Sequence, residues 1–382
     1  MSVLRLSVLS RFTMSSSLLI VVVSWAALGV NGDVAGDGTS PALFPAMFVF
    51  GDSLVDNGNN NYLNSLARSN YFPYGIDFNG GPTGRFSNGK TFVDFIGELL
   101  GLPPIPAYME TLNGGASILR GVNYASAAGG ILEETGRHLG ERMSMGRQVM
   151  NFGRTLMELR STMTEEEALN EYLAKSLVVV SLGNNDYINN YLKPSLYLTS
   201  SIYDPTAFAD ILLSNFTNHL LELKGKGFRK FVVGAVGPLG CIPDQLAAGK
   251  APPGECVSEV NDMAELFNLR LRSLVDRLNN DDETSPRPVF VYGNTYGAFV
   301  DILSHPLAYG FDVTDTGCCG VGRNRGEITC LPLEVPCAMR ERHVFWDAFH
   351  PTEAFNMIIA LRAFNGSQSD CYPFNLSRLS LL

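Results

Sequence analysis

Five short apolar runs are spaced along the chain, and each run ends in residues that favour turns. The runs cover residues 46–52, 121–126, 177–186, 230–240 and 288–294. Apolar positions within them are nearly continuous instead of alternating with polar ones, which is typical of strands buried on both faces. We therefore expect these runs to form a parallel sheet that is covered by helices on both sides.

Segments with helical periodicity lie among these runs. They are residues 91–101, 146–163, 165–175, 205–225 and 260–280. One face of the second segment is apolar and consists of Val149, Phe152, Leu156 and Leu159. Thr164 and Glu167 predict a capping box for the third segment. Asp204 and Pro205 predict the N-cap and the first residue of the fourth.

The alternation of strands and helices predicts an α/β fold with three layers, in which a five-stranded parallel sheet lies between helices. No internal repeat and no linker divides the 382 residues, so we expect a single domain over residues 33–382. In this fold class, functional sites lie beyond the carboxyl ends of the strands. Ser53, Asn185 and Pro238 fall at such positions.

Residues 1–32 have the pattern of a secretory signal peptide. Arg5 and Arg11 precede an apolar stretch at residues 17–30, and small residues follow it near Gly32. A membrane anchor is the alternative, but this stretch is shorter than the ~20 residues that a spanning helix needs. Removing the segment changes the formal net charge from −10 to about −12. An acidic, secreted chain is a poor binder of nucleic acid.

Secretion affects how the seven cysteines are interpreted, because disulfides form in oxidising compartments. Cys241 and Cys256 flank one loop rich in proline and glycine, and we expect them to pair. A second loop carries four cysteines that we expect to pair among themselves: Cys318, Cys319, Cys330 and Cys337. Cys371 is then left over, and the absence of a C-x-x-C pair argues against a metal site. Three N-glycosylation sequons are present, at Asn215, Asn365 and Asn375.

The stretch FVFGDSLVDNGNNN, residues 48–61, places Ser53 directly after the first apolar run. The Gly, Asp and Asn residues around this serine fit a tight turn and loop. A serine nucleophile is the alternative, and it requires a base, a group that orients the base, and donors for the oxyanion. The G-x-S-x-G elbow of α/β-hydrolases is absent from the sequence.

One of five histidines would have to be the base: His138, His219, His305, His343 or His350. His350 follows Asp347 by three residues, a spacing at which a turn lets the carboxylate reach Nδ1–H of the imidazole. A surface pair without catalytic function also fits this spacing. Asn185, after Gly183, and the backbone N–H of Gly130 are candidate oxyanion donors, although turns account for each of them taken singly.

Together, these stretches resemble the four sequence blocks of the GDSL esterase/lipase family in the SGNH hydrolase superfamily, and above all its secreted plant branch. The blocks appear in order as FVFGDSLVDNGNNN, GVNYASAAGGILEETG, VVSLGNNDYINNY and FWDAFHPTEAFN. Three further stretches also match: PYGIDFNGGPTGRFSNGKTFVDF, FVVGAVGPLGCIP and CCGVGRNRGEITCLPLEVPC. The resemblance implies a catalytic triad of Ser53, Asp347 and His350. It also implies an oxyanion hole formed by Ser53, Gly130 and Asn185.

The resemblance further implies a flavodoxin-like sheet, hydrolysis of carboxylic esters, and no metal or organic cofactor. The expected partner is an ester substrate such as a lipid, cutin or an acetylated polysaccharide. The expected protein is a monomer in the extracellular space or the cell wall. Two alternatives stay open: an acyltransferase that uses the same residues, and a secreted binding protein without catalytic activity.

Overall fold

The computed structural model describes residues 42–280 and 286–382. The predicted signal peptide, residues 1–32, and the start of the predicted domain, residues 33–41, lie outside the described residues. Within the described ranges, no helix is long and apolar enough to cross a membrane.

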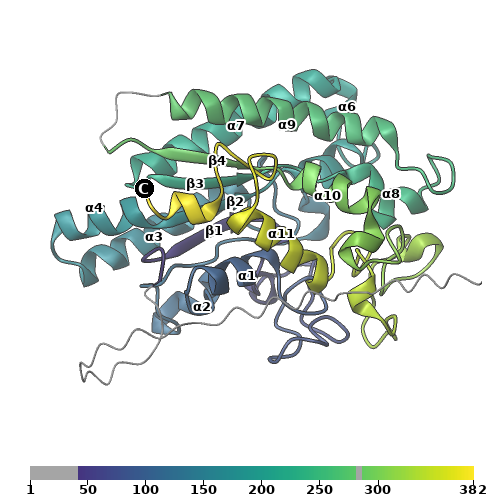
Figure 1. Cartoon of the computed structure of the whole chain (residues 1–382), viewed down its shortest axis with the longest axis horizontal. Coiled ribbons are helices and arrows are strands. Elements are labelled where there is room, and N and C mark those ends of the chain that lie inside the picture. Colours follow the sequence, from purple (N-terminus) through teal and green to yellow (C-terminus); the bar gives the residue numbers. More distant parts are fainter. Residues whose placement is uncertain (1–41, 281–285) are drawn as a thin grey trace, which may run out of the picture. The chain divides into compact units, whose positions relative to one another are not determined.

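Four parallel strands form the centre of the sheet, and a short antiparallel strand completes one edge (Figure 1). The strands are β1 (Met47–Gly51), β2 (Leu177–Ser181), β3 (Lys230–Gly234), β4 (Val289–Gly293) and β5 (Cys371–Tyr372). Their spatial order equals their order in the chain. The register pairs Val49 with Val179, and Val179 with Val232. The predicted α/β fold with a five-stranded sheet is confirmed, although the fifth strand is antiparallel.

The run at residues 121–126 is not the regular strand that the sequence predicts. It forms an isolated bridge with β1 through Asn123 and Val49. The N–H of Val49 donates to the carbonyl of Val122 at 3.0 Å, and the N–H of Tyr124 donates to the carbonyl of Val49 at 2.7 Å. The run therefore lies along the free side of β1. Counted as the second strand, it gives the order 2-1-3-4-5 of flavodoxin-like sheets.

Helices occupy the segments between the strands, and the last helix follows β5. They are α1 (Phe92–Leu99), α2 (Tyr108–Thr111), α3 (Met145–Thr162), α4 (Glu166–Lys175), α5 (Asn184–Asp186), α6 (Thr199–Ile202), α7 (Pro205–Gly225), α8 (Pro243–Ala247), α9 (Ser258–Asn279), α10 (Thr295–Ser304), α11 (Glu353–Asn365) and α12 (Leu376–Leu379). The five predicted helical segments correspond to α1, α3, α4, α7 and α9.

The sheet is buried on both faces, as the continuous apolar runs predict. Phe48 of β1 packs against Phe152 of α3, with ring centroids 5.6 Å apart, in a core shared with α7 and α9. The neighbouring residue, Val49, belongs to a second core with Ile96 of α1 and with residues of α11 and α12. Figure 1 shows α7 and α9 on one side of the strands and α1 and α11 on the other.

The two predicted helix starts differ in outcome. The side chain of Asp204 accepts a hydrogen bond from the N–H of Ala207 at 2.8 Å, and α7 begins at Pro205, as predicted. The capping box at Thr164 is wrong. Because α4 begins at Glu166 with Glu165 as its N-cap, the threonine lies one residue too early to cap the helix.

Six of the seven cysteines form disulfides, as expected. Cys241 pairs with Cys256. The other four pair as Cys318–Cys337 and Cys319–Cys330. Cys371 is free and buried.

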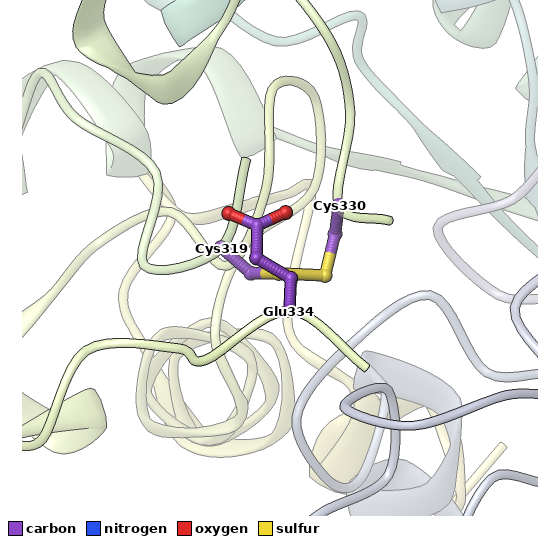
Figure 2. A group of neighbouring side chains, drawn as sticks. All are labelled: Cys319, Cys330 and Glu334. Atoms are coloured by element: carbon purple, nitrogen blue, oxygen red, sulfur yellow. A yellow bond between two sulfur atoms is a disulfide. The ribbon is translucent and has the colours of Figure 1, made fainter. Parts of the chain in front are cut away.

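Glu334 lies beside the Cys319–Cys330 disulfide and with it forms a group of potential metal ligands (Figure 2). Its carboxylate accepts hydrogen bonds from the N–H groups of Gly320 and Leu331 at 2.9 and 3.1 Å. Metals bind cysteine as a thiolate, and both sulfurs are here bonded to each other. The hydrogen bonds of Glu334 therefore hold together the loop around the Cys319–Cys330 disulfide, which we call the disulfide loop.

Candidate active site

Ser53 lies in a tight turn at the carboxyl end of β1. The N–H of Leu54 donates to the side chain of Asp52 at 3.0 Å, and the N–H of Val55 donates to the carbonyl of Asp52 at 3.2 Å. A Cβ at Gly51 would lie 2.2 Å from Cγ2 of Val55, so a side chain has no room there. The glycine thus lets the turn fold back on the strand and hold the serine at the edge of the sheet.

His350 lies between Ser53 and Asp347. Its Nε2 is 2.7 Å from Oγ of Ser53, and its Nδ1 is 2.8 Å from both carboxylate oxygens of Asp347. Oδ1 of Asp347 also accepts the N–H groups of Phe349 and His350, each at 2.8 Å. Asp347 is fully buried and His350 is nearly so. The structure therefore brings together the three residues that the sequence singled out from opposite ends of the chain.

The carboxyl of Asp347 is held in its ionised form. Burial by itself raises the pKa of Asp347, but the charge of His350 and the hydrogen bonds from His350, Tyr74 and Phe349 outweigh it. The pKa of Asp347 therefore lies below its ordinary value. An ionised carboxylate at Nδ1 fixes the tautomer of the imidazole and stabilises its charged form.

Tyr74 and Phe86 complete the surroundings of this pair, and the sequence analysis did not single them out. The hydroxyl of Tyr74 donates to Oδ2 of Asp347 at 2.5 Å. Burial and the charge of Asp347 raise the pKa of Tyr74 well above its ordinary value, so the hydroxyl stays a donor. The ring of Phe86 lies 4.8 Å from that of His350, centroid to centroid. Both residues belong to the stretch 73–95, which resembles the family but shows no pattern of charge or spacing.

Asn185, the predicted side-chain donor, lies at the carboxyl end of β2 and lines the same cavity as Ser53 and His350. Its Nδ2 donates to the carbonyl of Gly129 at 3.0 Å, and its Oδ1 accepts from Nδ2 of Asn189 at 2.7 Å. These two bonds fix which end of the amide is the donor.

Gly130, the predicted backbone donor, lies in the loop next to Asn185. Ala127 and Ala128 of this loop line the cavity, whereas Gly130 does not. A Cβ at Gly130 would lie 2.4 Å from Cγ2 of Thr135 and 2.7 Å from Oδ1 of Asp186. Close packing, and not an unusual φ, therefore requires glycine at this position.

Three buried carboxylates hold the loops around the site: Asp52, Asp56 and Asp186. Asp56 accepts the N–H of Ala127 at 3.2 Å, which ties the turn after β1 to the loop of Gly130. Asp186 accepts two N–H groups of the same loop, at 2.8 and 3.1 Å. Burial raises the pKa of each of these three carboxyls to about 6.

Asn59 and Asn60 of the first block are buried donors, and not only the turn residues that the sequence suggests. Nδ2 of Asn59 donates to the carbonyls of Asn123 and Ala125, both at 2.8 Å. Nδ2 of Asn60 donates to the carbonyl of Ala127 at 3.0 Å. These amides therefore bind the backbone of the second block to the first.

A cavity of about 430 Å³ opens at Ser53 and His350. Lys193 and His138 also line it, and Nδ1 of His138 lies 2.8 Å from the hydroxyl of Tyr197. Its position beyond the carboxyl ends of the strands is the one expected for this fold class. The arrangement offers a serine oxygen, an imidazole and an amide donor to a bound molecule.

The sequence as a whole matches a known family. The family model described as GDSL-like Lipase/Acylhydrolase matches residues 47–363. "GDSL esterase/lipase At5g08460" of Arabidopsis thaliana is 79% identical over 342 residues, which cover 89% of each chain. "GDSL esterase/lipase At1g71250" of the same plant is 53% identical and covers 90% of this chain and 91% of its own. "GDSL esterase/lipase 7" of that plant is 47% identical, with 96% and 98% covered. The predicted resemblance is confirmed: the chain belongs to the family of GDSL-like lipases and acylhydrolases and is a carboxylic ester hydrolase.

Proposed function

We propose that this hydrolase is a secreted serine esterase that works through an acyl-enzyme on Ser53. The observation that supports this proposal is the continuous series of contacts from Oγ of Ser53 through the imidazole of His350 to Asp347. Such a series supplies a nucleophile, a base and a group that orients the base.

In the first half of the proposed reaction, Nε2 of His350 takes the proton of Ser53 while Oγ attacks the ester carbonyl carbon. The bond to the alcohol oxygen then breaks, and His350 gives its proton to the leaving alcohol. In the second half, His350 takes a proton from water, and the hydroxide attacks the acyl-enzyme. The acid leaves, and the proton returns to Ser53. Asp347 stabilises the charged imidazole in both halves.

For the oxyanion we propose the N–H of Ser53, the side chain of Asn185 and an N–H of the loop that carries Gly130, the predicted donor. Ala127 and Ala128 are the residues of this loop that line the cavity. The hydrogen bonds of Asn185 support its part. One N–H of Nδ2 binds the carbonyl of Gly129, and Asn189 occupies the amide oxygen. Because Asn185 lines the cavity, we propose that the second N–H of Nδ2 donates to the oxyanion. A preorganised donor of this kind contributes about 3–4 kcal/mol to lowering the barrier.

We further propose that the enzyme acts outside the cell on a lipid, cutin or an acetylated polysaccharide. Three disulfides support an oxidising compartment. The signal-peptide pattern of residues 1–32 and the exposed sequon at Asn365 agree with it.

A Ser53→Ala variant tests the nucleophile. We expect kcat/KM for p-nitrophenyl acetate to fall by about a thousandfold or more, because the triad acts as a unit. A fluorophosphonate should label the unchanged protein and not the variant, while Ser65→Ala, on a nearby loop, should be labelled normally. Retention of activity in Ser53→Ala contradicts the proposal. If the unchanged protein is neither labelled nor active, the result would instead favour the alternative of a secreted binding protein without catalytic activity.

A further inference from the structure

The cavity at Ser53 continues past the reacting groups into the space between the sheet and α11. Val179 of β2 and Val232 of β3 are register partners, and both line the cavity. They keep 3% and 4% of their surface exposed, whereas Leu177, two residues earlier on the same face of β2, is fully buried. The floor of this inner section is therefore the α11-facing side of the central strands.

One stripe of α11 forms the opposite wall. Phe355, Ile359 and Ala363 all line the cavity, and their spacing of four residues places them on one face of the helix. With a rise of 1.5 Å per residue, Phe355 and Ala363 are about 12 Å apart along the axis. Because α11 begins shortly after His350, Phe355 lies at the end nearest the reacting groups and Ala363 at the far end.

Arg362 lies at the far end of this stripe, and its charge is already paired. Its Nε donates to Asp370 and its Nη1 to Asp301, both at 2.6 Å. Arg362 and Asp370 line the cavity next to the buried thiol of Cys371. The charged groups at this end therefore satisfy one another, and the wall between them and Ser53 is mainly apolar.

We infer that this inner section binds the acyl chain of the substrate, with the ester carbonyl at Ser53 and the chain end toward Cys371. The section passes from Ser53, in the turn after β1, to Gly293 of β4. This is about three strand spacings, or roughly 14 Å. An unbranched acyl chain of medium to long length fills such a space, whereas an acetyl group leaves its apolar walls in contact with water. The inference rests on the proposed function and deepens it by naming the substrate class.

The acyl-length profile of the unchanged protein is the first test. We expect kcat/KM for p-nitrophenyl esters to rise from acetate through butyrate and octanoate to decanoate. The burial of each added methylene should raise it by up to about fourfold. A profile that is highest for acetate overturns the inference.

Two variants on α11 test the location of the chain. Ile359→Trp fills the middle of the inner section. It should lower the ratio of decanoate to acetate activity, and the ratio of octanoate to acetate activity, at least tenfold each. Residue 363 lies deeper in the section. Ala363→Phe should therefore lower the ratio of decanoate to acetate activity and leave the ratio of octanoate to acetate activity unchanged. Leu361→Trp, an exposed position on the same helix, is the matched control and should keep the ratios of the unchanged protein. The inference is overturned if Ile359→Trp leaves both ratios unchanged, or if Ala363→Phe lowers the octanoate ratio as much as the decanoate ratio.

The unchanged protein gives a second readout that does not depend on whether the variants fold. Labelling of Ser53 by a decyl fluorophosphonate should be faster than labelling by a methyl fluorophosphonate, because the alkyl group occupies the inner section. Equal rates overturn the acyl-chain assignment and leave the proposed esterase intact. A protein that reacts with neither reagent and hydrolyses no ester overturns the proposed function as well.

Discussion

The hydroxyl of Tyr74 is the contact that distinguishes the acid of the proposed triad from an ordinary carboxylate in a turn. It donates to Oδ2 of Asp347, the oxygen that receives none of the backbone N–H groups of the turn. Hydrogen bonds to a carboxylate favour its charged form. In the proposed triad, Tyr74 would therefore be a positioning residue that acts on the reaction through Asp347 and His350.

A Tyr74→Phe variant should lower kcat about tenfold to a hundredfold, since a hydrogen bond to a charged group contributes about 1.5–3 kcal/mol. KM should change less than twofold, because the hydroxyl is bonded to Asp347 and its removal leaves the ring in place. The Tyr71→Phe variant is the control. Its neighbouring hydroxyl donates to the carbonyl of Cys330 and not to the acid. Steady-state kinetics of both variants checks the prediction, and a loss confined to KM contradicts it.

At the residue scale, the sequence predicts a contact where two reactive side chains are only a few residues apart. The three-residue spacing of Asp347 and His350 lets the carboxylate meet the imidazole in a turn, so this pair could be predicted. The buried amides of Asn59 and Asn60 could not, because their partners are backbone carbonyls far along the chain. Any residue type supplies such carbonyls, and so the sequence carries no signal for them.

The disulfide loop supports the segment that carries the proposed acid. The N–H of Cys318 donates to the carbonyl of Phe345 at 3.0 Å, and the N–H of Cys319 donates to the carbonyl of Trp346 at 2.7 Å. Asp347 follows directly. Because the Cys319–Cys330 disulfide closes this loop, its removal should loosen the backbone beside the acid.

A Cys319→Ser/Cys330→Ser double variant should lose stability and activity together. Cys241→Ser/Cys256→Ser is the matched control, because it opens a loop of similar length. For each of the two loops, closure by a disulfide is expected to stabilise the folded state by about 3 kcal/mol. Thermal melting should show similar losses of Tm for the two. We expect kcat, measured well below either Tm, to fall at least fivefold more in the first variant. Equal kcat values would show that the loop does not position Asp347.

Elements could be predicted where an apolar run is long enough to show its period. β1 to β4 and the long helices meet this condition. β5, Cys371–Tyr372, does not, because two residues form no run. The segment at 121–126 has the apolar run of a strand, and its backbone is bonded to β1 from Met47 to Gly51, yet only Asn123 and Val49 form a bridge.

On the scale of the whole molecule, the site depends on packing between the two ends of the described chain. Ser53 and His350 are 297 residues apart in sequence and 2.7 Å apart in space. The core shared by α1 and α11, which includes Ile96 and Ala360, holds the two ends together. Family resemblance could supply this pairing in advance, because the four blocks imply it, but composition and periodicity could not.

The buried carboxyls around the site make the stability of the whole molecule depend on pH. Burial raises the pKa of Asp56 from 3.8 to about 6 in the folded protein. The folded state therefore holds this proton to a higher pH than the unfolded chain does. The resulting stabilisation is complete below about pH 4 and is lost as the pH rises through about 6. Asp347, whose pKa is lowered, is ionised in both states over this upper range and contributes no slope there.

An Asp56→Asn variant isolates this contribution. Asparagine keeps an acceptor for the N–H groups that Oδ1 binds but cannot ionise, and its amide faces the N–H of Ala127, so we expect lower stability at every pH. The difference in the free energy of unfolding between the variant and the unchanged protein should narrow from pH 5 to pH 7. Over this range only the unchanged protein gains a buried negative charge, at the carboxyl of Asp56. Urea unfolding at pH 5, 6 and 7 measures this gap. Asp315→Asn, on an exposed loop, should keep a constant gap. A gap for Asp56→Asn that widens with pH would mean that the carboxylate is stabilised by its N–H donors more than it is opposed by burial.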